Sequence, residues 1–188
     1  MNNSDCQPEQ EMVSRRDFLR LSSASIVALS IPGFLRRPGI PKTLFAQRAQ
    51  YPRQRIAKLS ELVAREPLRF RYPWDHPAAG NILIMLDEPA GGAVGPEANV
   101  VAFNSFCTHQ GGPLEGQFHG NLGVVGPCPL HWTTFDLTRH GMVISGHATL
   151  GLPQIILELE GDEIFASAVQ GLIFSYSNNL VDPTGEGA

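Results

Sequence analysis

The chain has 188 residues, 43% of them hydrophobic and 17% charged, which suits a soluble globular domain with a real core. Its 19 Gly and 15 Pro favour tight turns and an all-β fold over a helical one. The first 48 residues hold 7 of the 14 Lys and Arg, and from His76 onward Arg139 alone faces 11 acidic residues. Such an acidic body repels phosphate backbones, so we expect no nucleic-acid partner.

The N-terminal segment places paired arginines (SRRDFLR, Ser14–Arg20) before a mildly apolar run from Leu21 to Leu35. This pattern resembles the twin-arginine export signal of bacteria. The run is short and serine-rich compared with the about 20 apolar residues of a membrane span. We therefore expect residues 1–48 to be a twin-arginine signal that sends the folded protein, with its cofactor, to the periplasm. No clean cleavage site follows, so retention of the leader as an N-terminal anchor, and with it membrane association, stays open.

Residues 49–188 form the expected folded domain, and the pattern up to Phe106 predicts mainly β-strands. We predict two edge strands around a helical turn near Ser60–Ala64. Strands at Asn81–Asp87 and Asn99–Phe106 flank a loop whose Gly and Pro allow no regular element. No helical pattern of ten or more residues follows that turn.

A loop-rich block from Cys107 to Phe135 interrupts the strands, and β signals return at 141–146, 153–169 and 171–177. A Gly161-Asp162 pair between two alternating runs predicts a hairpin. The last dozen residues are typical of a loose tail. The pattern therefore predicts an antiparallel β domain with one long insertion, at about 107–135, between strands.

Two boxes in this insertion each carry one cysteine and one histidine. CTHQGGPL supplies Cys107 and His109, and GPCPLHWTTF supplies Cys128 and His131. Gly and Pro beside both boxes force tight loops, and two such loops can present four ligands together. In an exported domain the two cysteines can instead form a disulfide.

Three kinds of metal site use such ligands. Zinc accepts two Cys and two His, although structural zinc sites usually pair C-x-x-C with two histidines. A blue copper site takes two His, one Cys and a weak axial Met, for which Met142 is nearest, and it leaves Cys128 unused. A Rieske [2Fe–2S] cluster takes two Cys on one iron and two His on the other, and it alone uses both boxes as written.

The boxes and the sequence around them also resemble a known family. CTHQGG and CPLHWTTF resemble the two Rieske boxes, and EPAGGAVGP with GPCPLHWTTFDLTRHGMVISGHATLGLPQIILELEGDEIFA resembles the small subunit of bacterial arsenite oxidase and close relatives such as iodate reductase. The resemblance covers about Arg55–Asn178 and the leader. It implies a Rieske-type antiparallel β domain with one [2Fe–2S] cluster, whose inner iron would be held by Cys107 and Cys128 and whose outer iron by His109 and His131.

The sequence departs from many members of this family at two places. Gly112 and Leu130 stand where many members carry a second cysteine pair that forms a disulfide between the loops. Thr133 and Phe135 stand where high-potential members carry Ser and Tyr, which donate hydrogen bonds to cluster sulfurs. We expect Thr133 to keep the first bond and Phe135 to lack the second, giving a potential in the middle of the range of about −150 to +300 mV.

The remaining histidines of the body are expected at the surface or beside the site and not as ligands: His76, His119, His140 and His147. Arg139 and His140 form the one basic spot in the acidic body and are a candidate contact for a partner.

The resemblance implies electron transfer without substrate chemistry in this chain. A large molybdopterin subunit would oxidise arsenite, and this periplasmic subunit would pass its electrons to a cytochrome c or azurin. Three alternatives remain open. The chain would be the Rieske subunit of an iodate reductase, with electrons running inward, or the Rieske subunit of a cytochrome bc-type complex, or a zinc-bound structural domain with no redox role.

Overall fold

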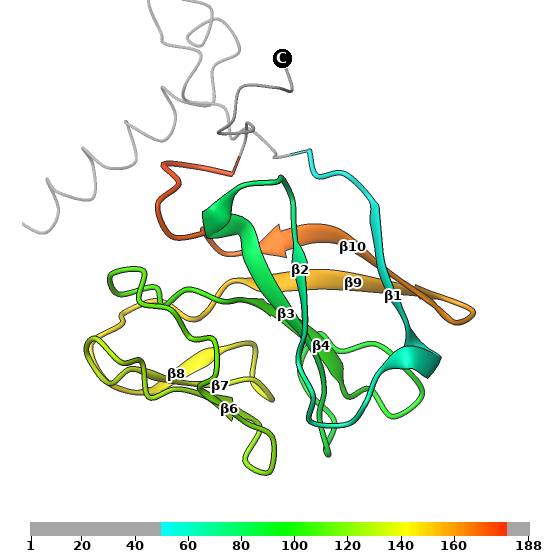
Figure 1. The fold of residues 1–188 in the computed structure, drawn as a ribbon, viewed down its shortest axis with the longest axis horizontal. Helices are drawn as coiled ribbons and strands as arrows, with labels where there is room; N and C mark the ends of the chain where they lie inside the picture. Colours follow the sequence, from blue (N-terminus) through cyan, green and yellow to red (C-terminus); the bar gives the residue numbers. More distant parts are fainter. Residues whose placement is uncertain (1–49, 180–188) are drawn as a thin grey trace, which may run out of the picture. The chain divides into compact units, whose positions relative to one another are not determined.

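The computed structural model describes residues 50–179 (Figure 1). The expected leader over 1–48 and the tail from Leu180 onward lie outside the described residues. Within them the chain forms ten β-strands and two short 3-10 turns, with no α-helix, so the prediction of an all-β fold is confirmed. No helix among the described residues has the length and apolarity to cross a membrane.

The larger sheet has six antiparallel strands in the order β1-β10-β9-β4-β3-β2. Their bounds are Gln54–Lys58 (β1), Leu68–Arg71 (β2), Gly80–Met85 (β3), Val100–Asn104 (β4), Gln154–Glu160 (β9) and Glu163–Gln170 (β10). The two predicted edge strands are β1 and β2, at opposite edges, and the turn between them includes the 3-10 turn η3, Leu59–Glu61. The predicted hairpin at Gly161 and Asp162 joins β9 to β10.

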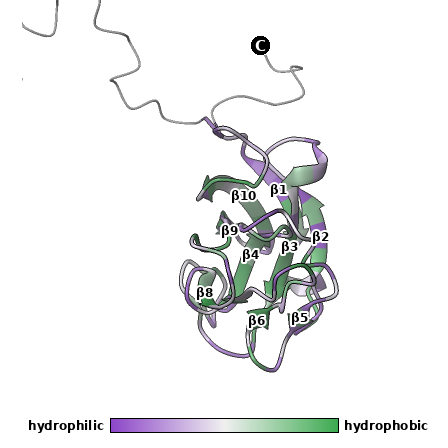
Figure 2. Cartoon of the chain, turned by 90° about the vertical axis from the view of Figure 1, so that its left-hand side faces the viewer, coloured by the Kyte–Doolittle hydropathy of each residue, from purple (hydrophilic) through white to green (hydrophobic). Residues whose placement is uncertain are grey.

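The central strands are buried on both faces because their apolar residues run without interruption. Successive side chains of a strand point to opposite faces of the sheet, so β3 and β4 contribute to two separate clusters. One cluster contains Ile82, Ile84, Leu86, Val101 and Phe103. The other contains Leu83, Val100 and Ala102, with Tyr72 and Ile155. Figure 2 shows the resulting hydrophobic colour of β3, β4 and β9, while β1 carries hydrophilic residues.

The smaller sheet is inserted between β4 and β9, which pair directly through Ala102 and Ile155. It has four antiparallel strands in the order β5-β6-β7-β8. Their bounds are Phe118–His119 (β5), Val124–Val125 (β6), Thr134–Asp136 (β7) and Met142–Ser145 (β8). The insertion therefore holds more regular structure than a loop-rich block at 107–135 suggests, and it continues through β8, because β7 pairs with a strand that lies beyond Phe135.

The prediction of a strand at 171–177 is wrong. Strand β10 ends at Gln170, and Gly171 then takes a φ of 99°, which turns the chain away from the sheet. The apolar residues that suggested a strand are buried through a turn instead: the N–H of Tyr176 donates to the carbonyl of Ile173 (3.2 Å), and both side chains join the core.

Candidate metal centre

The first Cys-His box folds into a closed loop after β4. The N–H of Cys107 donates to the carbonyl of Gly112 (2.8 Å), and the carbonyl of Cys107 accepts from the N–H of Gly111 (2.8 Å). Gly111 has a φ of 67°, the left-handed region in which glycine has no steric cost. This loop holds His109 between the cysteine and the turn.

The second box repeats the same hydrogen-bond pattern before β7. The N–H of Cys128 donates to the carbonyl of Thr133, and its carbonyl accepts from the N–H of Trp132, both at 2.8 Å. Trp132 takes the position that Gly111 has in the first loop and also has a left-handed φ, 63°. In a residue with a Cβ this costs about 1–2 kcal/mol, so the loop is held in a strained conformation.

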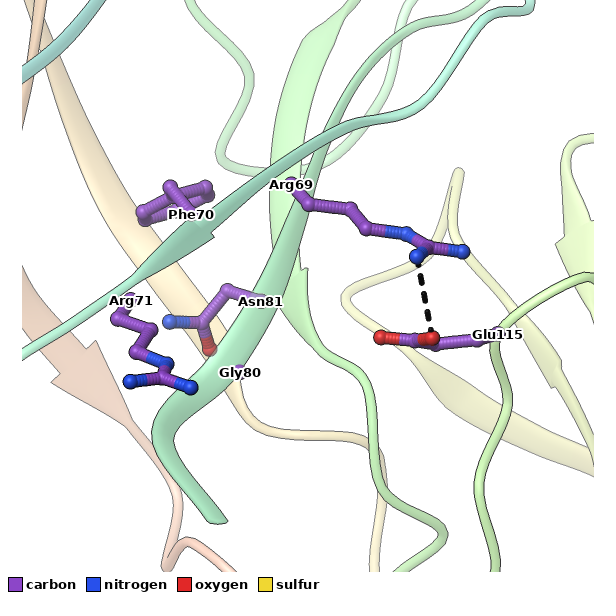
Figure 3. Close-up of a pocket in the computed structure, with 6 residues that line it drawn as sticks. All are labelled: Arg69, Phe70, Arg71, Gly80, Asn81 and Glu115. Atoms are coloured by element: carbon purple, nitrogen blue, oxygen red, sulfur yellow. Dashed lines mark ion pairs between the residues drawn. The ribbon is translucent and has the colours of Figure 1, made fainter. Parts of the chain in front are cut away.

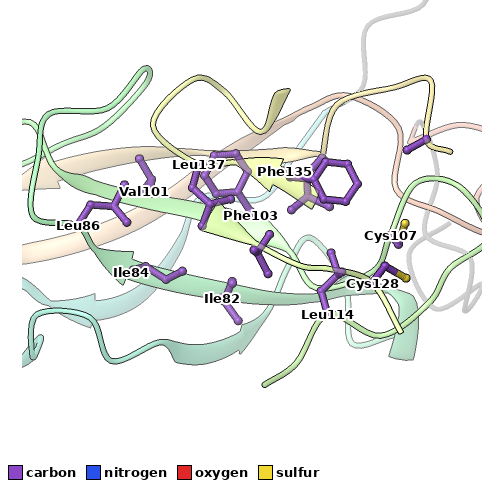
Figure 4. Packing of buried hydrophobic residues seen from close by; sticks show 13 residues of the cluster. Ile82, Ile84, Leu86, Val101, Phe103, Cys107, Leu114, Cys128, Phe135 and Leu137 are labelled. Atoms are coloured by element: carbon purple, nitrogen blue, oxygen red, sulfur yellow. The ribbon is translucent and has the colours of Figure 1, made fainter. Parts of the chain in front are cut away.

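The two cysteine side chains meet where the loops face each other. Each residue is 1% exposed, and both sulfur atoms lie at one end of the cluster between the sheets (Figure 4). They are free thiols, so the disulfide alternative is not found in this structure. Burial is the largest influence on Cys107 and raises the pKa of its thiol, while the N–H of His109 and the hydroxyl of Thr133 donate to it and act in the opposite direction. A cation at this point would favour the thiolate form.

Three histidine rings lie together in the insertion. The ring centroids of His109 and His131 are 4.6 Å apart with the planes at 85°, and His147 stacks on His109 at 5.7 Å and 27°. Partial burial, together with the neighbouring His131 and His147, lowers the pKa of His109 and so favours its neutral form. The Nδ1 atom of His109 is buried without a hydrogen-bond partner. A buried imidazole nitrogen without a partner is uncommon, and a metal ion is one of the groups that satisfies it.

Gly112 and Leu130, the positions without cysteines, lie against each other across the two loops. A Cβ on Gly112 would lie 2.6 Å from the sulfur of Cys128 and 3.0 Å from Cδ1 of Leu130. The second loop therefore passes too close for any side chain at position 112 without movement. Close packing of Leu130 on a glycine replaces the covalent bridge expected at this point in many relatives.

Thr133 supports the site from below. It is fully buried, and its Oγ1 accepts the backbone N–H groups of His147 (3.1 Å) and Ala148 (3.3 Å). Its side chain also acts on the thiol of Cys107, in the direction that lowers the pKa of that thiol. Gly146 makes this approach possible, because a Cβ there would lie 2.4 Å from the Thr133 Cα.

Phe135 lies deep in the same region. It is 0% exposed in β7 and packs in the cluster that contains both cysteines and Leu114 (Figure 4). Its ring supplies apolar contact and no hydrogen-bond donor. The sulfurs on this side therefore face a dry, apolar wall.

The other histidines have partners elsewhere. His76 accepts the N–H of Ala78 at its Nδ1 (3.2 Å), and the Nδ1 of His140 lies 2.8 Å from Oε1 of Gln154. His119 is exposed on β5. His147, expected at the surface or beside the site, is exposed and lies next to the rings of His109 and His131. It stands sixteen positions after His131, and the turn after β8 returns it to the loops.

A separate hollow of about 320 Å³ lies beside β2 and β3 (Figure 3). Two of its lining residues are arginines, but Arg69 pairs with Glu115 (3.3 Å) and Arg71 pairs with Asp75. Both charges are thus neutralised nearby, and this hollow offers no strong site for an anion. The Arg69–Glu115 pair instead links the larger sheet to the insertion.

The described residues contain no group of three or more His, Cys, Asp or Glu side chains arranged to hold a single metal ion. A tetrahedral zinc site needs four such ligands at one ion. A two-iron cluster needs only two protein ligands at each iron. Cys107 with Cys128, and His109 with His131, would supply two such pairs.

Comparison with known proteins identifies the family of this chain. Residues 54–155 match the Rieske [2Fe–2S] domain family. The chain is 54% identical over 171 residues to iodate reductase subunit IdrB of Denitromonas iodatirespirans, covering 91% of this chain and 89% of that protein. It is 50% identical over 176 residues to iodate reductase subunit IdrB of Pseudomonas sp. (strain SCT), covering 93% and 89%.

The fold is also similar to that of a solved Rieske protein. The soluble domain of Rieske protein II from Sulfolobus acidocaldarius superposes with a TM-score of 0.58 at 20% identity, covering 71% of this chain and 86% of that one. With the family match and the two long relatives, the alternative of a zinc-bound structural domain is set aside. The chain belongs to the Rieske [2Fe–2S] domain family, and it is an electron-transfer subunit whose cofactor is a Rieske-type [2Fe–2S] cluster.

Proposed function

We propose that this chain is the Rieske subunit of a periplasmic iodate reductase and passes electrons to a large molybdopterin catalytic subunit. The observation that carries the proposal is the identity of 54% and 50% with two iodate reductase subunits over more than nine tenths of this chain. The arsenite oxidase expected from the sequence is the related alternative, in which electrons run in the opposite direction.

The proposal assigns the cluster to four ligands: Cys107 and Cys128 on the inner iron, and His109 and His131 on the outer iron. The burial of both thiols, their mutual contact and the unpartnered Nδ1 of His109 support this assignment. The lack of room for a Cβ on Gly112 supports it as well, since the loops close on the sulfur of Cys128.

When bound, the cluster accepts and gives up one electron at a time. The protein supplies two different environments for it. Burial of the cysteine side removes water, whereas the histidine side lies nearer the surface, beside exposed Leu130 and Trp132. A partner can therefore approach the histidine rings, and a carrier such as a cytochrome c or azurin loses one electron for each electron that the large subunit gains.

The ligand assignment is tested by metal analysis and EPR spectroscopy of the dithionite-reduced protein matured with iron. We expect two irons per chain and a rhombic signal with an average g below the free-electron value. His109→Ala and His131→Ala should lose this signal. The matched control is His147→Ala, which removes a third ring from the same cluster of histidines and should retain both irons. Retention of the signal in His131→Ala, or zinc in place of iron, would refute the assignment.

The partner is tested by co-purifying the chain with its large subunit and following the oxidation state of the cluster by its visible absorption. Iodate added to the reduced complex should oxidise the cluster, and arsenite added to the oxidised complex should leave it unchanged. The reverse pattern would establish the arsenite oxidase alternative. The periplasmic location, which the twin-arginine pattern alone supports, is tested by cell fractionation. The protein should be found in the periplasmic fraction.

A further inference from the structure

The segment that follows β10, residues 171–179, is called the C-terminal strap here. It is fixed to the larger sheet at several points. Ile173 is fully buried, and Tyr176 is buried in the same cluster. Near its end, Nδ2 of Asn179 donates to the carbonyl of Gly171 (2.8 Å) and closes the strap on itself. Its course is therefore set by the core of the larger sheet. It is not set by the two loops that carry the Cys-His boxes, which are called the first ligand loop (107–112) and the second ligand loop (128–133).

Between these anchors the strap places Phe174 on the first ligand loop. A Cβ on Gly111 would lie 2.3 Å from Cε1 and 2.5 Å from Cδ1 of the Phe174 ring, so the ring occupies the space of a side chain at that position. Phe174 is 36% exposed, so one part of the ring faces solvent while another covers the loop. Gly111 is the residue whose N–H closes the loop on the carbonyl of Cys107.

Among the described residues, the corresponding position of the second loop faces solvent. Trp132, at the position equivalent to Gly111, is 71% exposed. That loop is held instead by the buried hydroxyl of Thr133. The two loops repeat one backbone pattern but are fastened differently, the second from within the insertion and the first with help from a segment 63 positions further along the chain.

We propose that Phe174 is a positioning residue for His109. Anchored by the C-terminal strap, its ring presses the first ligand loop into the closed form that directs His109 and Cys107 to the cluster. It thereby takes over part of the task that a disulfide between the loops has in many relatives. This inference rests on the ligand assignment proposed above.

The test compares Phe174→Ala, the milder Phe174→Leu and the control Leu172→Ala, which truncates an exposed side chain of the same strap. Hydrogen exchange of the amides at 107–112 is measured with and without iron, and loss of the visible absorption is timed in the presence of a chelator. Because the Phe174 ring is 36% exposed, its truncation costs less than that of a fully buried ring, and we expect about tenfold faster exchange and cluster loss in Phe174→Ala. Phe174→Leu should be intermediate and Leu172→Ala unchanged.

Two further readouts separate positioning from general stability. Phe174→Ala should broaden the EPR signal and shift the midpoint potential, because His109 samples more orientations. Gly111→Ala should lose most of its cluster, and Gly111→Ala combined with Phe174→Ala should recover part of it, because the clash is removed while the unfavourable φ remains.

Equal rates and equal spectra in Phe174→Ala and Leu172→Ala would overturn the proposal, as would a double variant no better than Gly111→Ala alone. The exchange of iron-free protein measures the contact without the cluster. If wild-type protein lacks the rhombic signal, the ligand assignment is refuted. If the amides of iron-free Phe174→Ala still exchange faster than those of iron-free wild type, the contact of Phe174 with the first loop is established all the same.

Discussion

Replacement of Thr133 by valine removes one buried hydroxyl group that acts on the thiol of Cys107. Valine has nearly the shape of threonine, so the main change at this fully buried position is the loss of the hydroxyl and its hydrogen bonds. Two hydrogen bonds are lost, those accepted from the N–H groups of His147 (3.1 Å) and Ala148 (3.3 Å). The interaction of the hydroxyl with the thiol of Cys107, which lowers the pKa of that thiol, is lost as well. Stability and redox potential therefore respond to different bonds of one side chain.

The size of each effect follows from these bonds. His147 is exposed, so its N–H can find water, whereas Ala148 is buried and its N–H cannot. One unsatisfied buried amide costs about 1–3 kcal/mol, and we expect the free energy of unfolding to fall by that amount. In the wild-type protein a donor to sulfur would stabilise the reduced cluster, which carries one more negative charge than the oxidised cluster. Loss of this donor therefore lowers the redox potential. If the difference between the two oxidation states is about 1.4 kcal/mol, the potential falls by about 60 mV for a one-electron couple.

The assay is a redox titration followed by EPR, with chemical unfolding of the same samples. Thr133→Ser keeps the hydroxyl and is the matched control, expected to retain the wild-type potential. A Thr133→Val protein with unchanged potential and an intact cluster would refute the claim that the hydroxyl donates to sulfur. Loss of stability without a change in potential would assign Thr133 a structural role only.

Three further predictions concern single residues. Phe135→Tyr places a hydroxyl beside the cysteines in the apolar core. A new hydrogen bond to sulfur should raise the redox potential by tens of mV, about 60 mV at most for one such bond. Voltammetry that finds no rise would show that the new hydroxyl does not donate to sulfur. Gly112→Ala puts a Cβ within 2.6 Å of the Cys128 sulfur, and iron content measured after purification should fall sharply, whereas full occupancy would contradict this steric argument. The hydroxyl and N–H of Ser60 donate to the Asp162 carboxylate and lower its pKa, so its contribution to stability is present above about pH 5 and is lost as pH falls below its unfolded pKa of about 3.9. Asp162→Asn should therefore show a lower melting temperature at neutral pH and a smaller acid dependence, and identical pH profiles in calorimetry would count against the link.

The amino-acid sequence alone indicated most of the fold and the composition of the site. The apolar runs along 81–87 and 99–106 predict β3 and β4, because a strand buried on both faces needs an unbroken apolar run. The Gly161-Asp162 pair predicts its hairpin, because two residues with turn geometry fix the register locally. The proposed ligands can be picked out in the sequence because ligand chemistry depends on residue type and short spacing: Cys107, His109, Cys128 and His131.

The tertiary structure decided what depends on residues far apart in the chain. No local pattern brings His147 onto the ring of His109, or Phe174 onto the bare backbone of Gly111. The apolar run at 171–177 has the composition of a strand, yet β10 already fills its place beside β9 and the segment turns over the first ligand loop instead. The spacing and chemical type of neighbouring residues can be recognised in the sequence itself. Contacts between distant segments depend on which apolar surfaces stay exposed after the sheets have formed.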